Sequence, residues 1–90
     1  MNKARRKALD ELHARLEAVV EDLRNMVVEI SQHKDDEQDY FDNMPESLQN
    51  GERGEKAQSA VEALDDALDG VGEAVDSLDA AYHSLAEATS

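Results

Sequence analysis

The stretch VEALDDALDGVGEAVDSLDAAYHSLAEA, residues 61–88, consists of four consecutive heptads and decides the fold of this chain. Each heptad opens with an apolar or aromatic residue, at position a, and places a second one three residues later, at position d. The a residues are Val61, Leu68, Val75 and Tyr82, and the d residues are Leu64, Val71, Leu78 and Leu85. Such spacing forms one stripe along an α-helix, the contact seam of a coiled coil. The stretch therefore predicts a helix over about 55–88 that packs against another helix.

The other faces of this predicted helix are alanine-rich or acidic. Position g, beside the seam, is occupied by alanine throughout: Ala60, Ala67, Ala74, Ala81 and Ala88. The outward positions carry a band of carboxylates: Glu62, Asp65, Asp66, Asp69, Glu73, Asp76 and Asp79. No lysine or arginine follows Lys56. The helix thus combines an apolar seam, an alanine flank and an acidic outer surface.

A second heptad pattern lies nearer the N-terminus. Its a row is Leu9, Leu16, Leu23 and Ile30, and its d row is Leu12, Val19, Met26 and His33. Val20 and Val27, at position e, widen the apolar stripe, as expected for a helix with more than one neighbour. Neither glycine nor proline interrupts residues 1–42, so a helix is predicted over about 3–38.

The segment between the two patterns, about 39–54, predicts a connection. Pro45 suits the first turn of a helix, and Asn43 is a candidate N-cap for a short helical turn over 45–49. The two heptads match layer by layer when Leu9 is paired with Leu85, Leu12 with Tyr82 and Leu16 with Leu78. We therefore predict an all-α fold: one antiparallel helical hairpin, or coiled coil, over 1–90.

A hairpin with apolar residues beside its seam predicts a further helix contact, because small or apolar flanks let helices approach closely. Two hairpins would then form a homodimer, a four-helix bundle. The predicted contact residues are Val20, Val27, Ala60, Ala67, Ala74 and Ala81. Asp35 to Glu46 make the connection end acidic and Lys3 to Lys7 make the other end basic, which favours an antiparallel dimer.

Composition excludes several classes of function. The 90 residues carry a net charge of −13 and no cysteine. Such a surface disfavours direct binding to nucleic acid or to an anionic membrane. The absence of cysteine and of long apolar runs predicts a soluble, cytoplasmic protein. Without a nucleophile–base pair, a glycine-rich phosphate loop or a set of metal ligands, we expect no catalysis, cofactor, metal or small-molecule substrate.

Residues 37–70 resemble a pattern in small, uncharacterised acidic coiled-coil proteins of tailed phages and prophages. The resemblance rests on the core YFDNMPESLQ, residues 40–49, and on the acidic heptads that follow it. It implies a phage-type origin and a place in the host cell cytoplasm. No activity is assigned to that group, so no functional residue is carried over.

Two classes of function remain. One is an interaction protein whose acidic band binds and inhibits a basic, nucleic-acid-binding host protein by imitating DNA. Tyr40, Phe41 and Met44 in the connection form an alternative binding site, or else cap the closed end of the seam. The other class is a structural or scaffolding homo-oligomer whose acidic surface only keeps it soluble.

Overall fold

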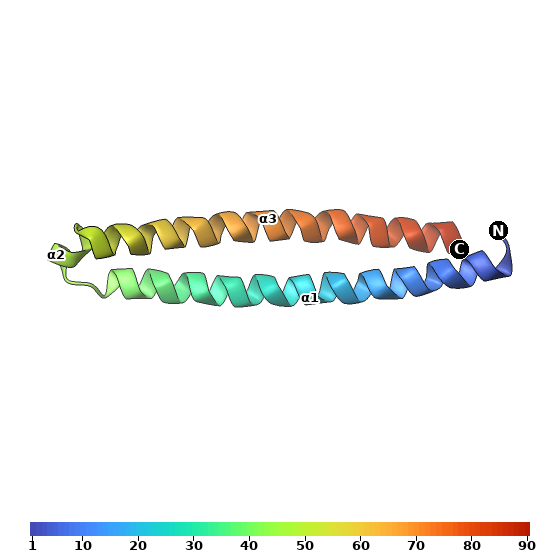
Figure 1. Cartoon of the computed structure of the whole chain (residues 1–90), viewed down its shortest axis with the longest axis horizontal. Coiled ribbons are helices and arrows are strands. Elements are labelled where there is room, and N and C mark those ends of the chain that lie inside the picture. The colour runs from blue at the N-terminus through green and yellow to red at the C-terminus, as the bar shows by residue number, and fades with distance from the viewer.

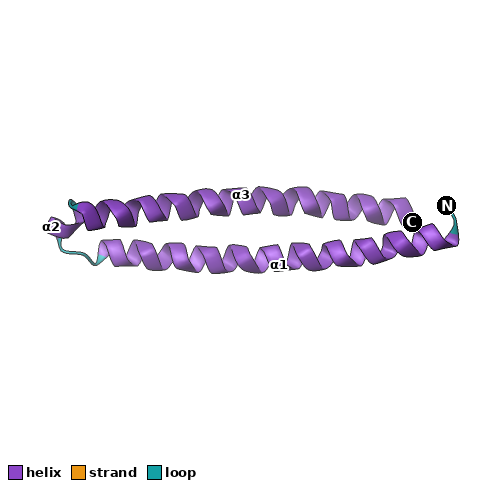
Figure 2. Cartoon of the chain, viewed as in Figure 1, coloured by secondary structure: helices purple, strands orange, loops and turns teal.

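The chain folds into a single long hairpin of helices. The computed structural model describes all 90 residues. It contains α1 (Lys3–Asp42), α2 (Glu46–Gln49) and α3 (Glu52–Thr89), and no strand. α1 and α3 lie side by side in opposite directions, so both termini lie at one end, the open end, and α2 lies at the other, the closed end (Figures 1 and 2). The predicted all-α fold with a long helix pair is confirmed.

The hairpin is long and thin. Its Cα trace extends over 69 × 14 × 14 Å. Only four of the 90 residues are buried, namely Val20, Gly54, Ala57 and Val75. None of the helices combines the length and the apolar character needed to cross a membrane.

The ends of α1 follow from local chemistry. The side-chain oxygen of Asn2 accepts a hydrogen bond of 2.7 Å from the backbone N–H of Arg5, which caps the first turn. α1 continues to Asp42, a few residues beyond the predicted end, because nothing before Pro45 interrupts it. Asn43 is the C-cap of α1, and Pro45 precedes the first turn of α2. The prediction that Asn43 caps the short helix is therefore wrong.

At the closed end, α2 is held against both long helices. The side-chain amide of Gln49 donates a hydrogen bond of 3.1 Å to the carbonyl of Phe41, near the end of α1. Gly54, in the first turn of α3, is buried against the main chain of Gln49. A Cβ atom at position 54 would overlap the Gln49 carbonyl group, so this close approach requires glycine.

On α3 the seam is the predicted one. All its a and d residues, from Val61 to Leu85, are buried or half-buried. The row continues toward the closed end through Ala57, which is 2 % exposed, and Gly54.

On α1 the seam differs from the prediction. The a row is half-buried as expected, but its companion is the e row of His13, Val20, Val27 and Lys34. Val20 is 3 % exposed, whereas Leu12, Val19 and Met26 of the d row are 45 %, 49 % and 41 % exposed. Val20 and Val27 therefore lie in the seam of the hairpin and not beside it.

The structure shows a physical reason for this choice. The d row and the e row each lie next to the a row at helical spacing, so either of them could complete an apolar stripe. With the e row in the seam, Arg24 and Lys34 reach Asp79 and Asp65 of α3. In this rotation the d row lies on the side of α1 opposite to these ion pairs. The d row contains most of the large exposed apolar residues of α1.

The register also differs from the prediction. Tyr82 stacks on His13 and hydrogen-bonds to Glu17, so it lies between these two residues, close to the level of Leu16. The predicted partner of Tyr82 was Leu12, about one helical turn nearer the N-terminus. The pairs Leu12–Tyr82 and Leu16–Leu78 are therefore wrong, although the antiparallel direction is right.

A pair of valine substitutions tests the seam. Val20→Ala removes two buried methyl groups and should lower the free energy of unfolding by about 1.5 kcal/mol. Val28→Ala is the control, because Val28 is 59 % exposed and alanine favours helix. Urea unfolding, monitored by helicity at one protein concentration, measures both. Equal effects of the two substitutions would contradict the observed seam.

A pair of glycine substitutions tests the closed end. Gly54→Ala places a methyl group into the Gln49 main chain and should destabilise the chain by about 1–3 kcal/mol. Gly70→Ala is the control: a methyl group added there would meet no other atom within 4 Å, and alanine should stabilise the helix by up to about 1 kcal/mol. Thermal melting should shift in opposite directions. A stabilised Gly54→Ala protein would show that α2 does not pack there.

Candidate interaction surfaces

The two flanks of the seam differ in chemistry. Ion pairs join Arg24 to Asp79 and Lys34 to Asp65, so these sides of α1 and α3 face each other. Because the helices are antiparallel, the opposite sides of both helices meet along the other flank of the seam. We call the first side the polar flank. We call the second the apolar flank, and it consists of Leu12, Val19, Met26, His33 and Tyr40 of α1 with Ala60, Ala67, Ala74, Ala81 and Ala88 of α3.

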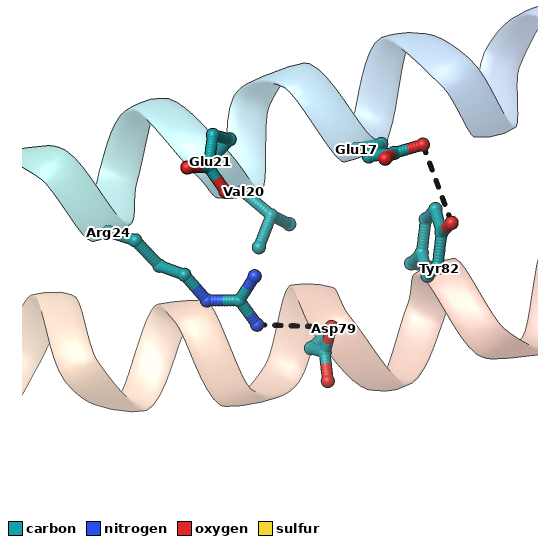
Figure 3. Close-up of a pocket in the computed structure, with 6 residues that line it drawn as sticks. All are labelled: Glu17, Val20, Glu21, Arg24, Asp79 and Tyr82. Carbon is teal, nitrogen blue, oxygen red and sulfur yellow. Dashed lines mark hydrogen bonds and ion pairs between the residues drawn. The ribbon is translucent and has the colours of Figure 1, made fainter.

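Ion pairs on the polar flank orient the helices. The Arg24 guanidinium lies 3.4 Å from the Asp79 carboxylate, and the Lys34 ammonium lies 2.7 Å from that of Asp65 (Figure 3 for the first pair). The hydrogen bond to Asp65 raises the pKa of Lys34 above its ordinary value. Exposed pairs of this kind contribute only about 0–1 kcal/mol each to stability. Both pairs are compatible with the observed rotation of α1, in which the e row lies in the seam.

Tyr82 makes the most specific contacts of the flank. Its ring stacks on the imidazole of His13, with centroids 3.9 Å apart, and its hydroxyl donates a hydrogen bond of 3.4 Å to the carboxylate of Glu17 (Figure 3 for the second contact). Removal from water raises the pKa of the Tyr82 phenol, and the charge of Glu17 raises it further. The Nε2 atom of His13 is buried without a hydrogen-bond partner.

His13 was not singled out from the sequence. It lies four residues after Leu9 and three before Leu16, a spacing that fits the seam. That spacing is the signal in the sequence that places His13 in the seam.

A shallow hollow beside these contacts gathers charged side chains. Glu17, Val20, Glu21, Arg24, Asp79 and Tyr82 line it (Figure 3). Arg24 lies among three carboxylates, and no serine, threonine, cysteine or histidine lines the hollow. Across the chain, no group of three or more histidine, cysteine, aspartate or glutamate side chains is placed to hold a metal ion.

The apolar flank is largely uncovered. Leu12, Val19 and Met26 are between 41 % and 49 % exposed, and Ala67, Ala74 and Ala81 are also exposed, whereas Ala60 is half-buried. Four of the residues predicted for an oligomer contact, the alanines, thus lie on this flank, while Val20 is enclosed within the hairpin. The large side chains beside the alanines come from the d row of α1.

At the closed end the apolar flank continues into a hollow. Tyr40, Asn43, Met44, Pro45, Leu48 and Arg53 line it. The aromatic pair predicted to act together is divided: Tyr40 is 52 % exposed, whereas Phe41 is half-buried. Met44 is half-buried and Leu48 is 40 % exposed.

The predicted acidic band is also divided. Asp65 and Asp79 turn toward the polar flank and pair with Lys34 and Arg24. The other five carboxylates, which we call the acidic face, are exposed and form no ion pair within the chain. They are Glu62, Asp66, Asp69, Glu73 and Asp76.

The contact between Tyr82 and Glu17 makes a testable prediction about pH. Glu17→Gln removes a negative charge, so the pKa of Tyr82 should fall toward the ordinary value of about 10. Ultraviolet titration of tyrosinate in a Tyr40→Phe background, where Tyr82 is the only tyrosine, measures the shift. Glu21→Gln is the control, because Glu21 lines the same hollow without bonding to Tyr82.

The raised pKa also fixes the sign of the stability change. A phenol that keeps its proton more tightly in the folded chain destabilises that chain as pH rises above the unfolded pKa of about 10. Glu17→Gln should reduce this alkaline loss of stability. Identical titrations of the Glu17→Gln and Glu21→Gln proteins would contradict a direct contact between Glu17 and Tyr82.

Comparison of the chain with protein-family models, with curated proteins and with solved structures finds no match.

Proposed function

We propose that this protein is a non-catalytic interaction module whose acidic face binds the basic, nucleic-acid-binding surface of another protein and blocks it. One observation carries the proposal: five exposed carboxylates lie along α3 without a cation of their own chain. Their cations must come from solution or from a partner.

The spacing of these carboxylates supports recognition by charge density. From Glu62 to Asp76 they alternate steps of four and three residues, or about 5 Å along the helix axis at 1.5 Å per residue. Phosphates of one DNA strand follow each other at about 3.4 Å along the axis. The acidic face is therefore coarser than a phosphate backbone, and a one-to-one replacement of phosphates is not expected.

A rigid helix nevertheless gives these charges an advantage over a flexible acidic tail. A groove lined with basic residues concentrates its positive potential on an approaching anion. Carboxylates already aligned on a helix lose little freedom when they enter such a groove. Each exposed pair contributes about 0–1 kcal/mol, so affinity has to come from several pairs together and should fall with salt.

The resemblance of residues 37–70 to small phage proteins supports the same direction. Small phage proteins commonly act by binding host proteins and blocking them. In this proposal the protein works in the cytoplasm of the host cell, and neither nucleic acid nor a membrane is its direct ligand.

The exposed apolar flank favours a second candidate function, that of a structural homo-oligomer. Leu12, Val19 and Met26 offer a helix contact that needs no basic partner. In that case the acidic face serves only to keep the assembly in solution. The exposed Tyr40 and Leu48 at the closed end offer a third type of contact, a compact apolar anchor for a partner.

A charge-reversal experiment distinguishes the candidates. The variant replaces Glu62, Asp69, Glu73 and Asp76 by lysine, which leaves the ion pairs of Asp65 and Asp79 intact. The matched control reverses four exposed acids of α1: Glu11, Asp22, Glu29 and Asp36. Each protein is immobilised and used to capture proteins from a bacterial lysate at low and at high salt.

We expect the unmodified protein and the control to retain a nucleic-acid-binding protein at low salt, with release by high salt or by added duplex DNA. The variant with the reversed acidic face should capture at least tenfold less of this protein, while its helicity stays unchanged. Full capture by the variant would exclude DNA mimicry. Loss of capture only on Tyr40→Ala with Leu48→Ala would assign binding to the closed end.

A further inference from the structure

The apolar flank is too extensive to be left in water. The α1 row of this flank recurs at every seventh residue and is apolar or aromatic except at His33. Its side chains Leu12, Val19, Met26 and Tyr40 are 41–52 % exposed. The hairpin itself buries only Val20, Ala57 and Val75 among its apolar residues. Small domains of this size bury little apolar surface, so covering the flank adds substantially to the stability of the folded chain. The flank therefore calls for a partner of similar length.

We propose that a second copy of this chain covers the apolar flank, antiparallel to the first, in a four-helix bundle with its two-fold axis beside Met26 and Ala74. The acidic face lies on the outer side of α3 and stays exposed in this bundle. The proposal is therefore independent of what the acidic face binds.

The symmetry of the two rows supports a second copy as the occupant. Met26 is the middle residue of the α1 row, and Ala74 is the middle residue of the α3 row. The two lie at nearly the same level, because Val27 lines one hollow together with Gly72 and Val75. A single two-fold axis at this level places each row against the same row of the second copy. It places Leu12 over Tyr40 of the second copy, and Ala67 over its Ala81.

The charges at the two ends determine the direction of the second copy. Lys3, Arg5, Arg6 and Lys7 lie in the first two turns of α1, at the open end of the hairpin. The last turns of α1 and the start of α2, at the closed end, carry Asp35, Asp36, Glu37, Asp39, Asp42 and Glu46. In the antiparallel bundle each basic end lies beside an acidic end. The alternative, with both closed ends together, places these carboxylates of one copy against the same carboxylates of the other.

The size of the flank is adequate for a stable dimer. The flank extends over 28 residues of each helix, or about 42 Å at 1.5 Å per residue, and the hairpin is 14 Å wide, so each copy offers about 600 Å². Two copies together bury about 1,200 Å², at the lower end of the range of about 1,200–2,000 Å² for stable protein interfaces. The small alanine side chains also allow the α3 helices of the two copies to approach closely.

Single cysteines test both the contact and its direction, since the natural chain contains none. In the proposed bundle residue 26 meets residue 26 of the second copy, so Met26→Cys should form a disulfide-linked dimer in most molecules under mild oxidation. Val28→Cys, which is exposed but off the flank, is the control and should form at least tenfold less. Sedimentation of the unmodified protein should give twice the mass of the chain.

A mixture of Met26→Cys and Ala74→Cys proteins tests the alternative direction. With both closed ends together, α1 of one copy would lie over α3 of the other, and the mixture would yield a disulfide between the two variants. Predominance of that mixed product would overturn the antiparallel arrangement. A monomeric mass, or equal crosslinking of the Val28→Cys control, would overturn the second copy as occupant.

A charged substitution separates assembly from folding. Met26 is 41 % exposed in the single hairpin, so Met26→Glu should leave helicity unchanged while weakening self-association at least tenfold. Met26→Leu, which keeps an apolar side chain at this position, should leave self-association unchanged. Unchanged self-association of the Met26→Glu protein would contradict the proposed interface.

Discussion

The hairpin depends on the row of α1 that packs against α3. With Val20 and Val27 in the seam, Arg24 and Lys34 reach carboxylates of α3, and Tyr82 fits between His13 and Glu17. The same rotation places Leu12, Val19 and Met26 on the opposite flank, beside the alanines of α3. The polar flank, the apolar flank and the division of the acidic band all follow from this one packing choice. Because so few residues are buried, no large core enforces it, and the polar contacts help to select it.

Sequence predicts α3 better than α1 for a physical reason. α3 has a single apolar stripe between alanines and carboxylates, so only one of its faces can form the seam. α1 has two overlapping stripes that share Leu9, Leu16, Leu23 and Ile30, and periodicity cannot rank them. The ranking comes from pairwise contacts with α3, such as that of Arg24 with Asp79, which become visible only when both helices are placed. The shift of about one helical turn in the register has the same origin.

The candidate surfaces were predictable to the same degree. The exposure of Glu62, Asp66, Asp69, Glu73 and Asp76 follows from the α3 heptad alone, and the structure agrees. The pairing of Asp65 and Asp79 required the position of α1 and was missed, as was the stacking of His13 on Tyr82. Tyr40 and Phe41 are neighbours in sequence, but one helical step of about 100° separates them, so one faces the flank and the other the seam.

The hairpin connection also has a kinetic consequence. Contacts between segments close loops of very different length: 8 residues separate Phe41 from Gln49, 31 separate Lys34 from Asp65, and 65 separate Glu17 from Tyr82. Each longer loop costs more chain entropy to close unless the shorter ones have already formed. Folding is therefore expected to start at α2 and to proceed toward the termini as a zipper. Backbone amides near the two termini should open first and exchange fastest with solvent, and those around Gly54 last.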